Sequence, residues 1–372
     1  MNSEKITQAL HEVEESDKAL AAAFERRLDA IKVIAEYRRE HGIPVPAEPD
    51  GGERAQELSA VITDAEKRPY YMSFFQGALS ASEKYHRRIM QGVRVAYTGV
   101  KGAFANIAAS RIFPDGEMVS YPDFAASYTA VERGECDCAV LPIENSYAGE
   151  VGQVIELMFS GTLYIGGVYS LRVKHNLLGL RGATPSGVKK VVSHPQALHQ
   201  CAPYIQAHGY ECIQETNTAV AAQRVAEGGD PTVAAIASAE TAKLYGLEVL
   251  DHDINESGDN TTRFAVFSRT PNIDEDHRDR SRFLLMFILQ NVPGALASAI
   301  NVISSYGFNM KVIRSRPIKE PAWEYYFYVE AEGDEESENG RRMISELRQH
   351  CRVLKVVGHY SDDIRLGASS II

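Results

Sequence analysis

The stretch "DNTTRFAVF", residues 259–267, places four polar residues at 260–263 directly before the apolar run 264–267. A short apolar run bounded by turn residues is typical of a buried strand. Polar groups at the mouth of such a strand serve either a turn or a ligand. The segments that follow the neighbouring strands bear on which of the two applies.

Short apolar segments alternate with helical patterns from residue 93 onward. The apolar segments are "VRVAY", "CAVLP", "KKVVS" and "VAAIA". This alternation is typical of an α/β domain with a largely parallel sheet. Open α/β sheets bind their ligands outside the carboxyl ends of the strands. We therefore expect the residues after these strands to converge on a cleft.

Unusual residues follow three of these strands. "TGVKGAFA" has glycines, including Gly102, that permit a tight turn whose N–H groups can hold an anion. "IENSYAG" contributes Glu144 and Asn145, and "HPQALHQ" contributes Gln196. A tight turn or a helix cap explains each segment singly. All of them in one α/β domain, together with "DNTTRF", favour a shared ligand site.

The N-terminal region reads as one long helix over residues 4–41. At about 1.5 Å per residue this helix is too long to bury its apolar stripe alone. We expect helices over 53–66 and 70–91, or a partner chain, to cover it, after the Pro- and Gly-rich breaker 42–52. The stripe has apolar residues at positions 6, 10, 13, 20, 24, 28, 31 and 34.

The C-terminal region follows the charged, turn-rich stretch 268–281, which suits a linker. Its expected elements are "RFLLMFIL", a helix 294–306, "NMKVIRSRPI", "WEYYFYVEAE", a helix 338–350 and "VLKVVGHY". The order βαββαβ predicts a small α+β sandwich with helices on one face of an antiparallel sheet.

The composition sets further bounds. The 372 residues suggest two or three domains, at about one per 150 residues. A net charge of −11 opposes binding to nucleic acids or anionic membranes, and no apolar run is long enough to span a bilayer. Five scattered cysteines predict neither a disulfide framework nor a zinc site. We expect a soluble cytoplasmic protein without a signal peptide.

Five motifs, in this order, resemble prephenate dehydratase: "GVKGAFA", "LPIENSYAG", "SHPQAL", "TNTAVAA" and "NTTRF". The C-terminal region resembles an ACT regulatory domain through "VPGALASAINVISSYGFNMKVIRSRP". The N-terminal region resembles the all-helical chorismate mutase domain fused to bacterial dehydratases. The resemblance implies an all-α domain at 1–92, a two-lobed α/β domain like periplasmic binding proteins at 93–270, and an α+β ACT domain at 281–362.

The resemblance also implies a reaction. Prephenate loses carbon dioxide and hydroxide to give phenylpyruvate in L-phenylalanine biosynthesis, and aromatisation drives the step without a metal or other cofactor. Thr262 would donate to the departing hydroxyl, Arg263 would supply positive charge, and Phe264 would begin the wall of the site. The residues expected to orient or bind the substrate are Asn260, Glu144, Asn145, Gln196, Thr218 and Gly102.

Two substrates and one other class of protein remain open. The family often carries Ser or Thr where Ala103 stands and Ser where Ala105 stands, and Ala103 also occurs in arogenate dehydratases. Arogenate dehydratase is therefore an alternative. A third hypothesis is an amino-acid-sensing binding protein, since two lobes around a cleft also suit ligand capture.

The mutase resemblance is partial. Arg27 and Arg38 are eleven residues apart and share a helix face, and Ser82 also matches the family. Leu10 stands where the family has arginine, and His86 stands where it has glutamine. We predict a helical dimerisation module without strong mutase activity, with a fully bifunctional enzyme that also accepts chorismate as the alternative.

The ACT resemblance implies phenylalanine binding at a subunit interface, in a homodimer or homotetramer. Arg314 replaces the family's glutamate in the motif now reading "RSRP", and this swap can remove attraction for an amino group. The residues implied for the effector site are Asn291, Gly294, Ala295, Leu296, Asn309, Arg314, Ser315 and Arg316.

Overall fold

The computed structural model describes residues 3–40, 58–59, 61–256, 258–271, 281–318, 325–361 and 364–367. The chain divides into two compact units, Met1–Val93 and Arg94–Ile372. The breaker 42–52 and residues 272–280 of the expected linker lie outside the described residues. None of the described helices is both long and apolar enough to cross a membrane.

The first unit contains two long helices, α1 (Ser3–Glu40) and α3 (Arg68–Gln91), which pack on each other. The expected long N-terminal helix is confirmed. The helix expected over 53–66 is wrong from residue 61 onward, because Asp64 Oδ1 accepts from the N–H of Glu66 in a turn. Residues 53–57 and 60 lie outside the described part of the chain.

Part of the apolar stripe on α1 stays uncovered in this single chain. Its positions 24, 28 and 31 are partly buried, whereas Ile34 is 49% exposed. The side chains that remain 44–65% exposed nearer the N-terminus are Ile6, Leu10, Val13 and Leu20. The α3 helix therefore covers only part of the predicted apolar stripe of α1.

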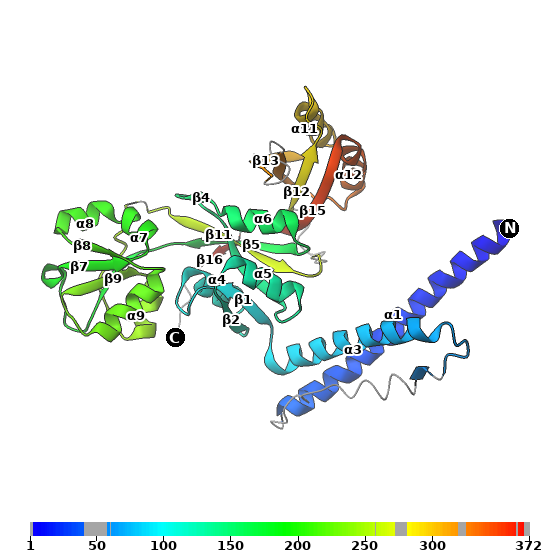
Figure 1. Cartoon of the computed structure of the whole chain (residues 1–372), viewed down its shortest axis with the longest axis horizontal. Coiled ribbons are helices and arrows are strands. Elements are labelled where there is room, and N and C mark those ends of the chain that lie inside the picture. The colour runs from blue at the N-terminus through cyan, green and yellow to red at the C-terminus, as the bar shows by residue number, and fades with distance from the viewer. Residues whose placement is uncertain are drawn as a thin grey trace. The chain divides into compact units, whose positions relative to one another are not determined.

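The first lobe of the second unit is built on a seven-stranded sheet of order β16-β5-β11-β3-β1-β2, with β4 beside β3. The strands are β1 (Arg94–Thr98), β2 (Glu117–Tyr121), β3 (Cys138–Asn145), β4 (Gly149–Glu150), β5 (Tyr164–Arg172), β11 (Thr261–Ser268) and β16 (Ile364–Leu366). The helices are α4 (Phe104–Ile112), α5 (Phe124–Glu132) and α6 (Gly152–Ser160). They pack beside β1 and β3 (Figure 1).

The second lobe is built on a five-stranded sheet of order β10-β6-β9-β7-β8. The strands are β6 (Asn176–Gly179), β7 (Lys190–Ser193), β8 (Glu211–Gln214), β9 (Val233–Ala237) and β10 (Glu248–Asp251). The helices are α7 (Pro195–Gln200), α8 (Ala202–His208), α9 (Thr218–Gly228) and α10 (Ala239–Tyr245). Asn217 caps α9 by accepting from the N–H groups of Ala219 and Val220.

Both sheets are mixed, so the expectation of a largely parallel sheet is wrong. In the sequence, the second lobe lies between strands β5 and β11, which both belong to the first sheet. There β11 lies antiparallel to both β3 and β5. The parallel pairs include β1 with β2 and β3, and β7 with β8 and β9. The chain thus crosses between the lobes twice, through residues 173–175 and 252–260.

The two interlobe segments, 173–175 and 252–260, are hydrogen-bonded to each other. Ile254 N donates to the carbonyl of His175, and Val173 N donates to the carbonyl of Asn260, both at 2.8 Å. Side chains also join the lobes, since Thr241 Oγ1 donates to the carbonyl of Gly102. A Cβ at Gly102, where φ is +89°, would lie only 3.0 Å from Leu244 Cδ2.

The C-terminal part of the second unit has the expected βαββαβ order and a four-stranded antiparallel sheet, β13-β14-β12-β15. The strands are β12 (Ser281–Leu289), β13 (Asn309–Pro317), β14 (Tyr325–Glu332) and β15 (Cys351–Ser361), and the helices are α11 (Ala295–Ser305) and α12 (Glu338–His350). Alternate residues of β12, such as Phe283 and Leu285, pack in the cluster with both helices.

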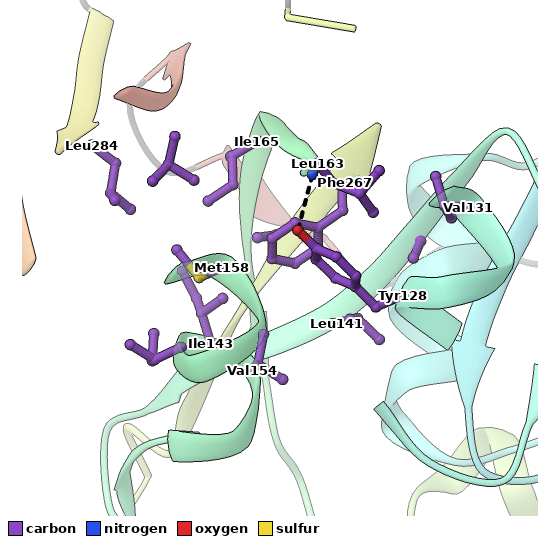
Figure 2. Packing of buried hydrophobic residues seen from close by; sticks show 14 of the residues in the cluster. Tyr128, Val131, Leu141, Ile143, Val154, Met158, Leu163, Ile165, Phe267 and Leu284 are labelled. Atoms are coloured by element: carbon purple, nitrogen blue, oxygen red, sulfur yellow. Dashed lines mark hydrogen bonds between the residues drawn. The ribbon is translucent and has the colours of Figure 1, made fainter. Parts of the chain in front are cut away.

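The other face of this sheet is also covered. Leu284 of β12 belongs to a second cluster with residues of β3, α6 and β5, such as Ile143, Met158 and Ile165 (Figure 2). In the same cluster Tyr128 OH accepts from Leu163 N. Burial on both faces explains the uninterrupted apolar run of β12.

Gly358 of β15 permits the close approach to β5. Its φ is +148°, and a Cβ there would lie 2.3 Å from the carbonyl oxygen of Ile165. The C-terminal sheet is therefore packed directly against the first lobe.

Candidate active site

A cleft of about 890 Å³ receives residues from both lobes and from both interlobe segments. Polar lining comes from amides, hydroxyls and imidazoles, and apolar lining includes Phe104 and Phe264. The polar lining residues are Thr98, Ser120, Tyr121, Asn145, His175, His194, Gln196, Gln200, Thr216, Asn217, Thr218, Asn260 and Thr262.

The sheet register brings the motifs "IENSYAG" and "NTTRF" together. Thr262 of β11 lies opposite Asn145 of β3, and both side chains are buried. Asn145 Nδ2 donates to Thr262 Oγ1 and to Asn260 Oδ1, each at 2.9 Å. Because Thr262 Oγ1 accepts this bond, its own hydrogen is left to donate to a ligand.

The chain of amide contacts continues into the second lobe. Asn260 Nδ2 donates to Gln200 Oε1 at 2.9 Å, and His175 Nε2 lies 2.9 Å from the same oxygen. The side chains of this chain from Asn145 to His175 are at most 8% exposed: Asn145, Asn260, Gln200 and His175. The chain thus runs from Thr262 across the interlobe segments to α7.

Gln200 and His175 are site residues that the sequence analysis missed. Gln200 follows Gln196 by four positions, so both share one face of α7, and this spacing could have revealed it. His175 lies in the segment "LRVKHNLL" as the middle one of three consecutive polar residues. Burial lowers the pKa of His175, although its contact with Gln200 acts in the opposite direction.

Three helices begin at the cleft. Residues of the first turns of α4, α7 and α9 all line it. The side chains of His194 and Asn217 cap α7 and α9, whereas the methyl side chain of Ala103 cannot cap α4. The first N–H groups of α4 are therefore free of a side-chain cap and can meet an anion. Gly102 shapes this turn through its positive φ.

Arg263 and Glu144 do not line the cleft, and their expected placement there is wrong. Successive strand residues point to opposite faces, so Arg263 points away from the side occupied by Thr262 and Phe264. Its Nη1 donates to Glu144 Oε2 at 3.1 Å, and Glu144 is its register partner on β3. Both charges lie on the face toward the C-terminal sheet.

Arg263 is held there by a buried carboxylate of β14. Its two terminal nitrogens donate to Glu330 Oε1 and Oε2 at 3.1 and 3.0 Å, and Glu330 is fully inaccessible. The hydroxyls of Tyr328 and Tyr360 also donate to Glu330. Burial alone would raise the pKa of Glu330, but Arg263 and the two hydroxyls hold this pKa below its ordinary value.

Arg314 also contacts the first lobe. Its guanidinium donates to Glu144 Oε1 and to Glu150 Oε1, and Arg316 pairs with Glu150 at 3.2 Å. Two arginines of β13 therefore hold the β3–β4 hairpin that carries Asn145.

The remaining residues expected at the effector site lie on three parts of the C-terminal domain. Asn291 and Gly294 precede α11, where Gly294 has φ +85°, and Ala295 and Leu296 form its first turn. Asn309 donates to Glu332 at 2.7 Å, and Ser315 is exposed on β13.

In the first unit the residues expected in a mutase pocket lie between α1 and α3. Arg27 Nε donates to Ser82 Oγ at 2.9 Å, and its guanidinium lies over the ring of Phe75. Arg38 lies near His86, whose pKa is lowered by burial and then by this positive charge. In this contact Arg27 is paired with a neutral hydroxyl.

Comparison with known proteins identifies the family. The family model "Prephenate dehydratase" matches residues 95–272. An arogenate dehydratase/prephenate dehydratase of Arabidopsis thaliana is 34% identical over 84% of this chain and 83% of its own. A bifunctional chorismate mutase/prephenate dehydratase of Aquifex aeolicus is 29% identical over 96% of this chain and 98% of its own.

A solved structure agrees with these relatives. A prephenate dehydratase of Arthrobacter aurescens, solved in complex with L-Phe, covers 72% of this chain and 90% of its own, with 25% identity and a TM-score of 0.67. The chain belongs to the prephenate dehydratase family, whose members supply phenylalanine biosynthesis. The expectation of an enzyme, rather than a binding protein, is confirmed.

Proposed function

We propose that the cleft converts prephenate to phenylpyruvate, with Thr262 as hydrogen-bond donor to the departing hydroxyl. The contact that carries this proposal is Asn145 Nδ2 to Thr262 Oγ1, because it directs the threonine hydrogen away from Asn145. A donor placed where negative charge develops lowers the barrier of the step. Gln196 and Thr218, which also line the cleft, would bind the carboxylates or the keto group.

The described lining of the cleft has no Lys, Arg, Asp or Glu. The movement of electrons in the dehydration of prephenate fits such a site. The bond between the ring and its carboxylate breaks, its electrons enter the ring, and the bond from the ring to the hydroxyl breaks. Prephenate dianion and one proton yield phenylpyruvate, carbon dioxide and water. A cation beside the ring carboxylate would stabilise the reactant and oppose this loss, so a neutral site favours it.

The side-chain carboxylate of the substrate still needs donors. The uncapped start of α4 offers backbone N–H groups and the positive end of a helix dipole. This arrangement takes over the role that the sequence analysis gave to Arg263. Arg263 and Glu144 would act instead by holding β11 and β3 in register from the other face.

Arogenate differs from prephenate by an ammonium in place of the keto group, and both activities occur among the names of relatives. A proton NMR time course of the purified chain with both substrates in one tube tests the proposal. We expect phenylpyruvate to form from prephenate. Turnover of arogenate alone would assign the chain to the arogenate branch, and turnover of neither would refute dehydration at this cleft.

We propose L-phenylalanine as effector at the C-terminal domain, which we assign as an ACT domain. The relative solved with L-Phe supports binding, and the contacts of Arg314 and Arg263 offer a route from this domain to β3 and β11.

We propose that the first unit serves assembly rather than strong mutase activity. Addition of chorismate to the same NMR tube tests this, since loss above the spontaneous rate would show a working mutase.

A further inference from the structure

His175 lies at the crossing of the two interlobe segments and is 3% exposed. Its backbone N–H donates to Asn255 Oδ1 at 3.1 Å, and its carbonyl accepts from Ile254 N at 2.8 Å. The rings of Phe104 and His175 pack edge to face, with 5.7 Å between their centroids and 80° between their planes. The backbone of His175 is thus held by the second interlobe segment, and its imidazole packs against Phe104 of the first lobe.

The direction of every hydrogen bond in the chain from Thr262 to His175 follows from two backbone donors. The N–H groups of Tyr147 and Ala148 both donate to Asn145 Oδ1, at 3.0 and 2.9 Å. Asn145 must therefore turn its Nδ2 toward Thr262 and Asn260. A side-chain amide has one accepting oxygen and one donating nitrogen. The orientation of Asn145 therefore fixes which atom of each neighbouring side chain must accept or donate.

The same logic continues to the imidazole. Asn260 Oδ1 accepts the hydrogen bond from Asn145, so Asn260 Nδ2 points toward Gln200 and donates to it. Gln200 must therefore accept with Oε1. Only a donor can share this oxygen, so His175 carries its hydrogen on Nε2 and a lone pair on Nδ1. No described residue hydrogen-bonds to Nδ1, and that atom is buried.

We propose that His175 is a positioning residue for the Thr262 hydroxyl, acting through Gln200, Asn260 and Asn145 by donating from Nε2. This role rests on the proposed dehydration. A histidine kept only for packing would leave Nδ1 buried without a partner and gain nothing from it, whereas an apolar side chain would avoid this cost. Compared with an apolar side chain, the imidazole adds a hydrogen-bond donor, Nε2–H, to Gln200. Burial, which lowers the pKa of His175, favours the neutral form that this role requires.

The two amide substitutions of His175 separate donation from packing. The side-chain nitrogen of glutamine can occupy the place of imidazole Nε2, whereas that of asparagine reaches only the place of Nδ1. Both His175→Gln and His175→Asn remove the ring, so both share any loss of packing. Gln206→Ala, on the exposed side of α8, controls for general effects of substitution in this lobe.

We expect kcat for prephenate to fall about tenfold in His175→Asn, the value of roughly one net hydrogen bond, while His175→Gln stays within about twofold. KM should change little in either, because the chain acts on the departing hydroxyl rather than on the carboxylates. Equal kcat in the two variants, or a change confined to KM, would overturn the proposal.

A second measurement does not depend on variants or on turnover. Nitrogen-15 NMR of the histidine-labelled wild-type chain reports which ring nitrogen carries hydrogen. We expect His175 as the neutral Nε2–H tautomer, and an Nδ1–H tautomer would overturn the proposal even if both variants failed to fold. Wild-type inactivity on prephenate would instead contradict the proposed function, with the tautomer still readable.

Discussion

Thr262 and Arg263 are adjacent on β11 but serve opposite faces of the sheet. Thr262 lines the cleft, while Arg263 forms a two-bond ion pair with the inaccessible Glu330 of β14. Three consecutive residues of the motif, 262–264, thus face cleft, C-terminal sheet and cleft in turn. The strand that carries the proposed hydroxyl donor is therefore fixed from behind by the C-terminal domain.

The first prediction concerns this ion pair. Arg263→Gln should lower the free energy of unfolding by about 3–5 kcal/mol, because it leaves Glu330 buried without its cation. Glu330→Gln in the same chain should recover part of that loss, so the two effects should not add. Denaturant unfolding of the two single variants and the double variant measures the coupling. Additive losses would contradict a direct pair.

The second prediction concerns Arg314. Arg314→Gln removes the cation beside Glu144 and Glu150, which are both partly buried. We expect a loss of about 1–2 kcal/mol in unfolding free energy, after allowance for solvent, and a weaker effect of phenylalanine on turnover. Lys311→Ala is the control, since Lys311 lies on the same strand and pairs with Glu332 near the surface. An unchanged response to phenylalanine in Arg314→Gln would exclude this route of coupling.

The third prediction pairs two histidines whose pKa shifts have opposite signs. Burial lowers the pKa of His175, so its contribution to stability is present above the unfolded pKa of about 6.5 and is lost as pH falls. The hydrogen bond to Glu335 raises the pKa of His359, so its contribution is present below about 6.5 and is lost as pH rises.

Unfolding free energies of His175→Gln and His359→Gln between about pH 5 and 8 test these signs. Each variant should remove one of the two opposing slopes. The charged residues next to His175, Lys174 and Asp253, pair with each other at the surface. Slopes that change in the same direction in both variants would contradict the assignment.

The fourth prediction concerns assembly. The exposed apolar side chains at the N-terminal end of α1, among them Leu10 and Val13, have the pattern of a helix that packs against another chain. Removal of residues 1–92 should therefore lower the oligomeric state. Sedimentation velocity of the full and shortened chains measures it, and an unchanged profile would refute a role of this helix in assembly.

The residues at the strand ends and the motifs that carry the family resemblance predicted much of this site from the sequence. Asn145, Gln196, Thr218, Asn260, Thr262 and Phe264 all line the cleft. The alternation of strand side chains could also have placed Arg263 on the far face, once Thr262 was assigned to the cleft. The motif was instead treated as one polar unit.

Other features could not be obtained from local pattern. Asn260 and Gln200 meet only because the chain crosses back from the second lobe, and this topology places β11 antiparallel between β3 and β5. The pairing of Arg314 with Glu144 likewise joins residues 170 positions apart. Such long-range contacts depend on how the sheets pack, which residue spacing does not encode.

The hydroxyl of Thr262 is the group on which the account depends most. Thr262→Val keeps the shape and removes the donor, whereas Thr262→Ser keeps the donor and removes a methyl group. With prephenate as substrate and phenylpyruvate as the measured product, kcat should fall by about 10²- to 10³-fold in Thr262→Val and much less in Thr262→Ser. Turnover of Thr262→Val near that of the wild type, in a folded protein, would contradict the assignment of Thr262 as the donor to the departing hydroxyl.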